Sequence, residues 1–230
     1  MNSQLSRTRA FHGFVAAVIT FSLVVQLALV WVTPLSPDGH YFALGLRVWN
    51  FFSYFTIWSN VVVLITLLQL VRDPLTSTVL HRTLRLSGLA MITVTGIVYV
   101  SLLARLWNPQ GWQAVADYGL HYVSPVITLL GWFVFDRTRT RGSFDSAVIG
   151  RSLVVPLVWV VYTYARAPFV HFEDAGVLRR FYPYPFMNVD ELGVVGVSMA
   201  LAVVFAFYLA LTAAFVWLSR KPSNDQRPSQ

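Results

Sequence analysis

The chain has 230 residues, of which 56% are hydrophobic, 12% are charged and none is cysteine. A soluble domain carries about 25% charged residues, so this composition excludes a disordered chain, a nucleic-acid-binding arm and most soluble enzymes. The absence of cysteine excludes disulfides, thiolate metal sites and cysteine nucleophiles. The formal net charge of +7 comes from 16 arginines and one lysine, most of them placed between apolar runs. That placement is typical of membrane topology rather than of a nucleic-acid partner.

Six apolar runs follow one another along the chain, and a helix that crosses a bilayer needs about 20 such residues. The segments without an acid, lysine or arginine are 28, 24, 19, 18, 14 and 28 residues long. We therefore expect an all-α polytopic membrane protein, with one domain over residues 1–220 and a disordered cytoplasmic tail over 221–230. The expected spans are 11–33, 49–71, 86–106, 118–135, 148–166 and 192–218.

The first and fifth runs need separate comment. The first follows two arginines, as a secretory signal would, but it is too long for a signal core and no small-x-small cleavage site ends it. We expect an uncleaved helix. The fifth run is short because Arg151 and Arg166 leave 14 residues between them. It reaches span length if both arginines extend to opposite interfaces, and Pro156 predicts a kink in it.

The basic residues predict the orientation of the six spans. The termini and the second and fourth loops carry twelve of the seventeen cations, and the other three loops carry five. The positive-inside bias therefore places both termini in the cytoplasm. The outer loop at 167–190 is long, aromatic and rich in proline, so we expect it to be functional rather than disordered.

Polar side chains form a narrow stripe on the second and on the fourth expected helix. These residues fall within arcs of about 120° and about 60°. The two sets are Asn50, Ser53, Thr56 and Asn60, and Asp117, His121, Ser124 and Thr128. Such a stripe must face protein or water, because an unsatisfied polar group in hydrocarbon costs several kcal/mol. If the two helices are neighbours, Thr56 and His121 can meet in the outer leaflet.

A threonine hydroxyl beside a histidine supports acyl transfer. The hydroxyl becomes nucleophilic when a base within about 2.6–3.2 Å takes its proton, and His121 is the candidate base. Asp117, one turn earlier, is the candidate that orients the imidazole. Asn60 and Ser124 are candidates for substrate binding and oxyanion stabilisation. The other interpretation is that these groups only bond helices together and that Asp117 caps its helix.

Several other chemistries fit the sequence poorly. A bis-histidine haem fails because His12 lies at the inner end of the first span and His121 near the outer end of the fourth. A retinal Schiff base fails because the only lysine, Lys221, lies in the tail. No two ligands show a spacing such as His-Glu-x-x-His. We therefore expect no metal and no other cofactor.

Three short motifs resemble those of the androgen-induced and androgen-dependent six-helix membrane proteins and their bacterial relatives. They are Phe55-Thr56-Ile57-Trp58-Ser59-Asn60, His121 with Pro125, and Tyr184-Pro185-Phe186. The resemblance covers most of the chain in span count and motif order. It implies a threonine hydrolase that acts on fatty acid esters of hydroxy fatty acids. By the same resemblance, Thr56 matches the catalytic threonine and His121 the catalytic histidine.

The function that we expect is hydrolysis of an amphipathic lipid ester within the outer half of a bilayer. Arg166, Arg179 and Arg180 are candidates to hold a substrate carboxylate, and interfacial anchoring is their other interpretation. The rival hypothesis is a non-catalytic lipid-binding or interaction protein, and a transporter comes third. The partners expected are membrane lipids and a lipid ester, without nucleic acid. The excess of arginine over lysine favours a GC-rich bacterial genome and a multi-pass protein of the bacterial plasma membrane.

Overall fold

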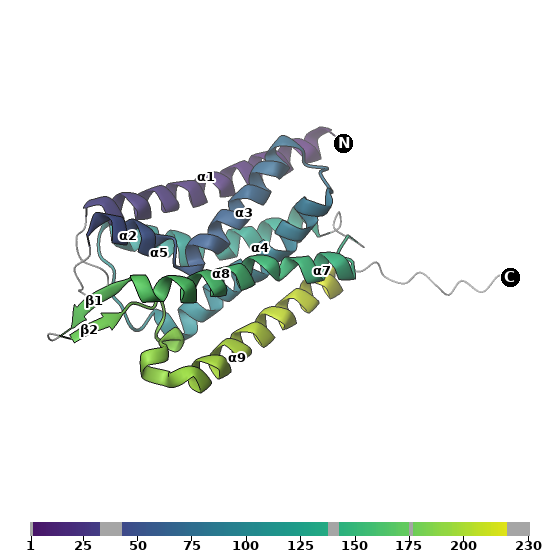
Figure 1. Cartoon of the computed structure of the whole chain (residues 1–230). Coiled ribbons are helices and arrows are strands. Elements are labelled where there is room, and N and C mark those ends of the chain that lie inside the picture. The colour runs from purple at the N-terminus through teal and green to yellow at the C-terminus, as the bar shows by residue number, and fades with distance from the viewer. Residues whose placement is uncertain (1, 33–42, 138–142, 175–176, 220–230) are drawn as a thin grey trace.

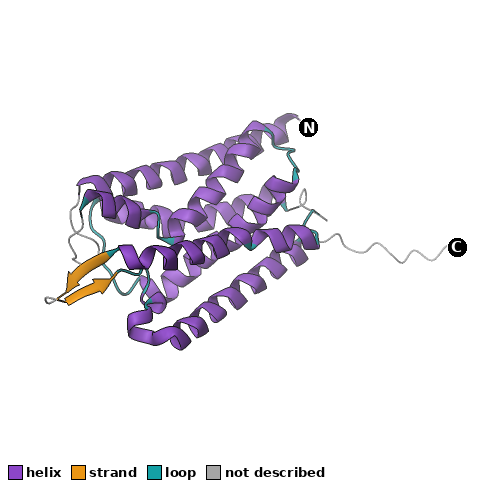
Figure 2. Cartoon of the chain, in the orientation of Figure 1, coloured by secondary structure: helices purple, strands orange, loops and turns teal. Residues whose placement is uncertain are grey.

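Six helices or runs of consecutive helix are long and apolar enough to cross a membrane. The computed structural model describes residues 2–32, 43–137, 143–174 and 177–219. The expected tail at 221–230 lies outside this part of the chain, as do Arg139 and Arg141. Figure 2 shows that the described chain is almost entirely helical apart from one two-stranded hairpin. The chain is therefore an all-α polytopic membrane bundle, as its composition predicts.

The crossings are built from single helices and from helices joined end to end, some through π-helical turns. The first crossing is α1 (Asn2–Val32) and the second is α3 (Phe55–Arg72). The third is α4 (Val79–Val98) with η1 (Tyr99–Leu103). The fourth is α5 (Trp112–Tyr118) with η2 (Gly119–Val123), α6 (Ser124–Gly131) and η3 (Trp132–Asp136). The last two are α7 (Ser146–Ser152) with α8 (Val154–Arg166) and η4 (Ala167–Phe169), and α9 (Val189–Leu218). Between crossings lie α2 (Leu44–Phe51), the hairpin strands β1 (His171–Asp174) and β2 (Val177–Arg180), and the turn η5 (Pro185–Met187).

The second crossing starts at Phe55, later than the expected 49–71, because the chain makes a tight turn after α2. The Ser53 N–H donates to the Asn50 carbonyl at 2.8 Å in this turn. The carbonyls of Phe52 and Ser53 accept hydrogen bonds from the indole N–H groups of Trp58 and Trp159, at 2.7 and 2.9 Å. Two tryptophans thus satisfy backbone groups that a break in the helix leaves open, which a membrane protein requires.

The fifth crossing breaks where Pro156 predicts a kink. Proline has no N–H to donate to the carbonyl four residues earlier, which here belongs to Ser152. Helix α7 ends at Ser152 and α8 begins at Val154. The hydroxyl of Tyr208, in α9, donates to the Ser152 carbonyl at 2.9 Å. The bond that Pro156 cannot make is therefore replaced by one that fastens α9 to the rest of the bundle.

Helices α3 and α4 pack together in the middle of the bundle, with α1 against α3 and α9 against α4 (Figure 1). The start of α1 and the end of α9 lie at one end, here called the terminal end, and the β-hairpin lies at the other, the hairpin end (Figure 1). Helix α9 bends near the hairpin end at Gly193, whose φ of 66° is a backbone conformation that glycine adopts at little cost.

A buried ionic cluster joins three crossings near the terminal end. One oxygen of Asp136 lies 3.0 Å from Nε2 of His12, and the other accepts a hydrogen bond from Arg85 at 2.5 Å. All three residues are at most 3% exposed. A carboxylate and a guanidinium in this setting compensate each other, and either alone would be a buried, unpaired charge. The cluster therefore fixes α1, α4 and η3 relative to one another.

Replacing Asp136 by asparagine leaves Arg85 buried without a negative partner. We expect Asp136→Asn to lower the free energy of unfolding by about 3–5 kcal/mol, measured as a loss of thermal stability in detergent. Asp190→Asn is the matched control, because Asp190 pairs with Arg180 at the surface, where ion pairs contribute little. Equal melting temperatures for the two variants would contradict this account of the cluster.

Candidate active site

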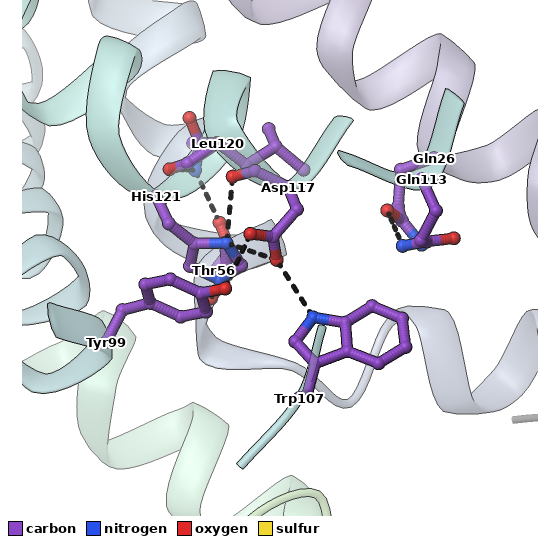
Figure 3. A network of polar contacts seen from close by, with 9 residues as sticks. Gln26, Thr56, Tyr99, Trp107, Gln113, Asp117, Leu120 and His121 are labelled. Carbon is purple, nitrogen blue, oxygen red and sulfur yellow. Dashed lines mark hydrogen bonds and ion pairs between the residues drawn. The ribbon is translucent and has the colours of Figure 1, made fainter. Parts of the chain in front are cut away.

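The structure brings Thr56 and His121 into direct contact. Thr56 is the second residue of α3, and His121 lies in the π-helical segment η2 of the fourth crossing. The Thr56 hydroxyl oxygen is 3.0 Å from Nε2 of His121, a hydrogen-bond distance (Figure 3). Thr56 is 7% exposed, and 16% of the His121 side chain is exposed. The pair is thus largely buried, and a small part of the His121 side chain is accessible.

The π-helical segment has a cause in the sequence and a consequence for the site. In a π-helical turn each N–H donates to the carbonyl five residues earlier. The Ser124 N–H donates to the Gly119 carbonyl in this way. The next residue, Pro125, has no N–H and therefore cannot supply a donor for the Leu120 carbonyl. The side-chain amide of Asn60 supplies it, with Nδ2 at 3.3 Å from the Leu120 oxygen. This bond ties α3 to the backbone next to His121.

Asn60 is fully engaged in holding this arrangement. Its amide nitrogen also donates to the carbonyl of Thr56 at 2.8 Å, and its oxygen accepts a 2.6 Å hydrogen bond from Ser124. Both Asn60 and Ser124 are fully buried. Asn60 thus holds the Thr56 carbonyl and the carbonyl next to His121, Ser124 holds the Asn60 oxygen, and neither side chain has a donor left over for an oxyanion.

Asp117 lies behind the imidazole and fixes its proton. The Nδ1 atom of His121 is 3.2 Å from one Asp117 carboxylate oxygen and 3.0 Å from the Asp117 backbone oxygen. Because both neighbours are acceptors, Nδ1 carries the proton and the Nε2 lone pair faces the Thr56 hydroxyl. This is the tautomer in which histidine can take a proton from threonine.

Two aromatic side chains that the sequence analysis did not single out complete the surroundings of Asp117. The Tyr99 hydroxyl donates to Asp117 at 2.5 Å, and the Trp107 indole donates at 3.3 Å (Figure 3). The Tyr99 ring also stacks on the imidazole, with centroids 3.8 Å apart and an interplanar angle of 15°. Tyr99 therefore restrains the plane of the His121 ring and also its acidic partner.

The first turn of α3 supplies backbone donors beside the Thr56 hydroxyl. The first N–H groups of a helix have no intrahelical acceptor, and here they belong to Phe55 and Thr56. The hydroxyl of Tyr184 interacts with these two backbone groups and with the Thr56 side chain. Tyr184 is 8% exposed, and its ring packs against Tyr54 and Trp159. Burial raises the pKa of the Tyr184 phenol, which keeps the hydroxyl proton available for donation.

The structure places two of the three arginine candidates at the surface and the third inside the protein. Arg180 forms a surface ion pair with Asp190, which raises the pKa of its guanidinium, and Arg179 is exposed on β2. Arg166 instead lies inside the protein, 2% exposed, at the end of α8. Within the ranges described here, no three histidine, cysteine or acidic residues gather as metal ligands would.

Neither a family model, nor a curated protein, nor a solved structure matches this chain. What the site can do must therefore be argued from its own geometry. A hydroxyl, an imidazole with a fixed tautomer and a carboxylate lie in series, as in enzymes that activate a hydroxyl nucleophile.

Removing the Asn60 amide tests its positioning role. Asn60→Leu leaves the Leu120 carbonyl and the Ser124 hydroxyl buried without their partner, at a cost of about 1–3 kcal/mol for each group. We expect a lower melting temperature in detergent and a shift of the His121 ring resonances in the NMR spectrum. The control is Asn108→Leu, at an exposed position, which should change neither. An Asn60→Leu protein with wild-type stability and spectrum would contradict the role.

Proposed function

We propose that this protein is a membrane-embedded hydrolase of amphipathic lipid esters. The observation that carries the proposal is the 3.0 Å contact between the Thr56 hydroxyl and Nε2 of His121, backed by Asp117 on the other side of the ring. A threonine that only packs helices has no need of an imidazole whose second nitrogen is held by a carboxylate. The resemblance of the Thr56 and His121 motifs to those of lipid-ester hydrolases points to the same class.

The reaction then proceeds through an acyl-threonine. Oγ of Thr56 attacks the ester carbonyl while Nε2 of His121 takes the hydroxyl proton, and the carbonyl π electrons move to oxygen. Collapse of the tetrahedral intermediate breaks the bond to the alcohol oxygen, which receives the proton from Nε2. Water then attacks the acyl-threonine with His121 again acting as the base. The products are an acid and an alcohol, and Thr56 regains its proton.

Negative charge on the carbonyl oxygen requires donors next to Thr56. The Tyr184 hydroxyl is such a donor, and the backbone N–H groups of Phe55 and Thr56 at the start of α3, together with the helix dipole, polarise it through its oxygen. The Tyr184 hydroxyl lies against the same groups. In this proposal the Tyr184 hydroxyl donates a hydrogen bond to the oxyanion. The N-terminus of α3 polarises the Tyr184 oxygen and strengthens that bond.

The orientation of the bundle decides which leaflet provides the substrate. By the positive-inside bias, the terminal end with both termini is cytoplasmic and the hairpin end faces outward. Helix α3, whose second residue is Thr56, begins on the side of the bundle toward the hairpin end (Figure 1), so the ester comes from the outer leaflet. A bacterial plasma membrane is the membrane that the excess of arginine favours.

Labelling by a fluorophosphonate probe tests for an activated hydroxyl. Detergent-purified wild type is expected to react covalently, and Thr56→Ala and His121→Ala are expected to lose labelling with unchanged melting temperatures. Thr93→Ala is the matched control, because the Thr93 hydroxyl is also buried in a helix but bonds its own turn, at the Leu89 carbonyl. A folded wild-type protein that takes no label would contradict the proposal and favour the non-catalytic lipid-binding protein.

The role of Tyr184 has a separate test. Tyr184→Phe keeps the aromatic contacts with Tyr54 and Trp159 but removes one oxyanion donor, so the labelling rate is expected to fall about 100-fold at constant stability. Tyr118→Phe removes an exposed hydroxyl and should label at the wild-type rate. An unchanged rate in Tyr184→Phe would leave the backbone N–H groups as the donors and exclude Tyr184.

A further inference from the structure

Two arginines with exposed side chains come together at the terminal end, where α1 begins and α3 ends (Figure 1). Arg9 lies near the start of α1, and Arg72 is the last residue of α3. A terminal nitrogen of the Arg9 guanidinium donates to the Arg72 carbonyl at 3.3 Å. The structure thus holds two cationic residues next to each other on neighbouring helices. We call Arg9 and Arg72 the arginine pair.

The arginine pair has no acidic partner among the described residues. No described carboxylate forms an ion pair with either side chain. Asp73 follows Arg72 and is exposed, and one of its oxygens accepts the Leu75 N–H at 2.9 Å. Arg7 adds a third exposed cation two residues before Arg9. These three cations and one anion give a net charge of +2, which attracts an anionic ligand.

Other arginines of the terminal end are compensated by the protein itself. Arg85 is paired with Asp136 in the interior, and Arg82 faces Asp145 at 3.8 Å. The dipole of α3 favours one cation at its C-terminus, which accounts for Arg72 alone. A second cation brought to the same helix end adds like-charge repulsion. A bound anion would remove that repulsion, and the protein supplies none here.

An exposed apolar stripe on α3 leads to the arginine pair. It consists of Val61, Ile65 and Leu68, which are 37%, 41% and 50% exposed. Spacings of four, three and four residues up to Arg72 place this stripe and Arg72 on one face of the helix. From Val61 to Arg72 the helix rises about 16 Å, close to the depth of one leaflet in a hydrocarbon core of about 30 Å. An acyl chain on this stripe therefore has its headgroup at the level of Arg72.

We propose that the arginine pair binds the phosphate of a net-anionic phospholipid from the leaflet at the terminal end, with an acyl chain along the stripe of α3. Guanidinium groups bind phosphate oxygens through paired hydrogen bonds, and basic residues beside a membrane span attract anionic lipids. A zwitterionic headgroup carries its own cation and leaves the charge uncompensated. The bound lipid bridges α1 and α3. This site does not depend on the proposed hydrolase, because it shares no residue with the Thr56–His121 pair.

Native mass spectrometry of the full-length protein in detergent tests the site. Dioleoyl phosphatidylglycerol and dioleoyl phosphatidylcholine are added separately, and the fraction of lipid-bound protein gives each Kd. We expect phosphatidylglycerol to bind about 10-fold more tightly, because its headgroup carries a net negative charge. Equal Kd values for the two lipids in the wild type would overturn the proposal, whether or not any variant folds.

Two double variants with the same loss of charge locate the site. Arg9→Gln with Arg72→Gln is expected to weaken phosphatidylglycerol binding about 25-fold, because each arginine near an anionic headgroup contributes about fivefold in affinity. Arg105→Gln with Arg151→Gln removes two exposed arginines elsewhere and should keep the wild-type Kd. Equal weakening in both double variants would assign the binding to net charge alone and overturn the site.

Melting temperatures separate lipid binding from folding. Without lipid, Arg9→Gln with Arg72→Gln should melt at the wild-type temperature, because both side chains are exposed. Added phosphatidylglycerol should raise the melting temperature of the wild type and not of this variant. Arg9→Lys with Arg72→Lys keeps both charges and should recover most of the increase. An equal increase on adding glycerol 3-phosphate would assign the pair to a soluble phosphate and overturn the lipid site.

Discussion

The hydrogen bond from Asn60 to the Leu120 carbonyl is the interaction on which the rest of the site depends. In hydrocarbon a backbone carbonyl must find a donor, and Pro125 removes the one that the π-helical turn would otherwise use. Asn60 replaces it from another helix at 3.3 Å. The same amide holds the Thr56 carbonyl. One side chain thus sets the spacing between Thr56 and His121, because it satisfies a backbone carbonyl on each of their two crossings.

Two carboxylates organise opposite ends of the bundle by the same physical means. Asp117 accepts hydrogen bonds from Tyr99 and Trp107 and faces His121, and Asp136 accepts from Arg85 and lies against His12. Each acid sits on the fourth crossing and contacts residues of other segments. The difference is in the cation. Arg85 balances Asp136 permanently, whereas the group facing Asp117 is an imidazole that can gain and lose a proton. The first arrangement suits a structural tie, and the second suits proton transfer.

The pattern of residues in the sequence predicts the six crossings and the pair of Thr56 and His121. It does not predict contacts between side chains that are far apart in the sequence. Uninterrupted apolar runs predict six spans, because the length needed to cross a bilayer is fixed. Helical spacing puts His121 and Asp117 on one face. Tyr99 could not be singled out and Tyr184 stood in a motif without a role of its own, since aromatic residues near the ends of spans are ordinary at membrane interfaces. Their roles arise from partners on other crossings.

The role of Asn60 could not be predicted from the sequence either, for a different reason. A polar stripe indicates that amide and hydroxyl groups face protein, but it does not say which acceptor each one meets. The sequence shows Pro125 and Asn60 as separate features. Only the register of the fourth crossing against α3 reveals that the orphan carbonyl next to His121 is the partner of that amide.

Pro125 also bears on how the protein is made. A chain inserts into the membrane from its N-terminal end as it is synthesised, so α3 with Asn60 is already in place when the fourth crossing emerges. That crossing enters with one carbonyl that its own backbone cannot satisfy, and it is complete only after it docks on α3. Helix α3 therefore provides the surface on which the fourth crossing docks. The Thr56–His121 pair forms in the same docking event, so a bundle assembled in the wrong order would lack both the bond and the site.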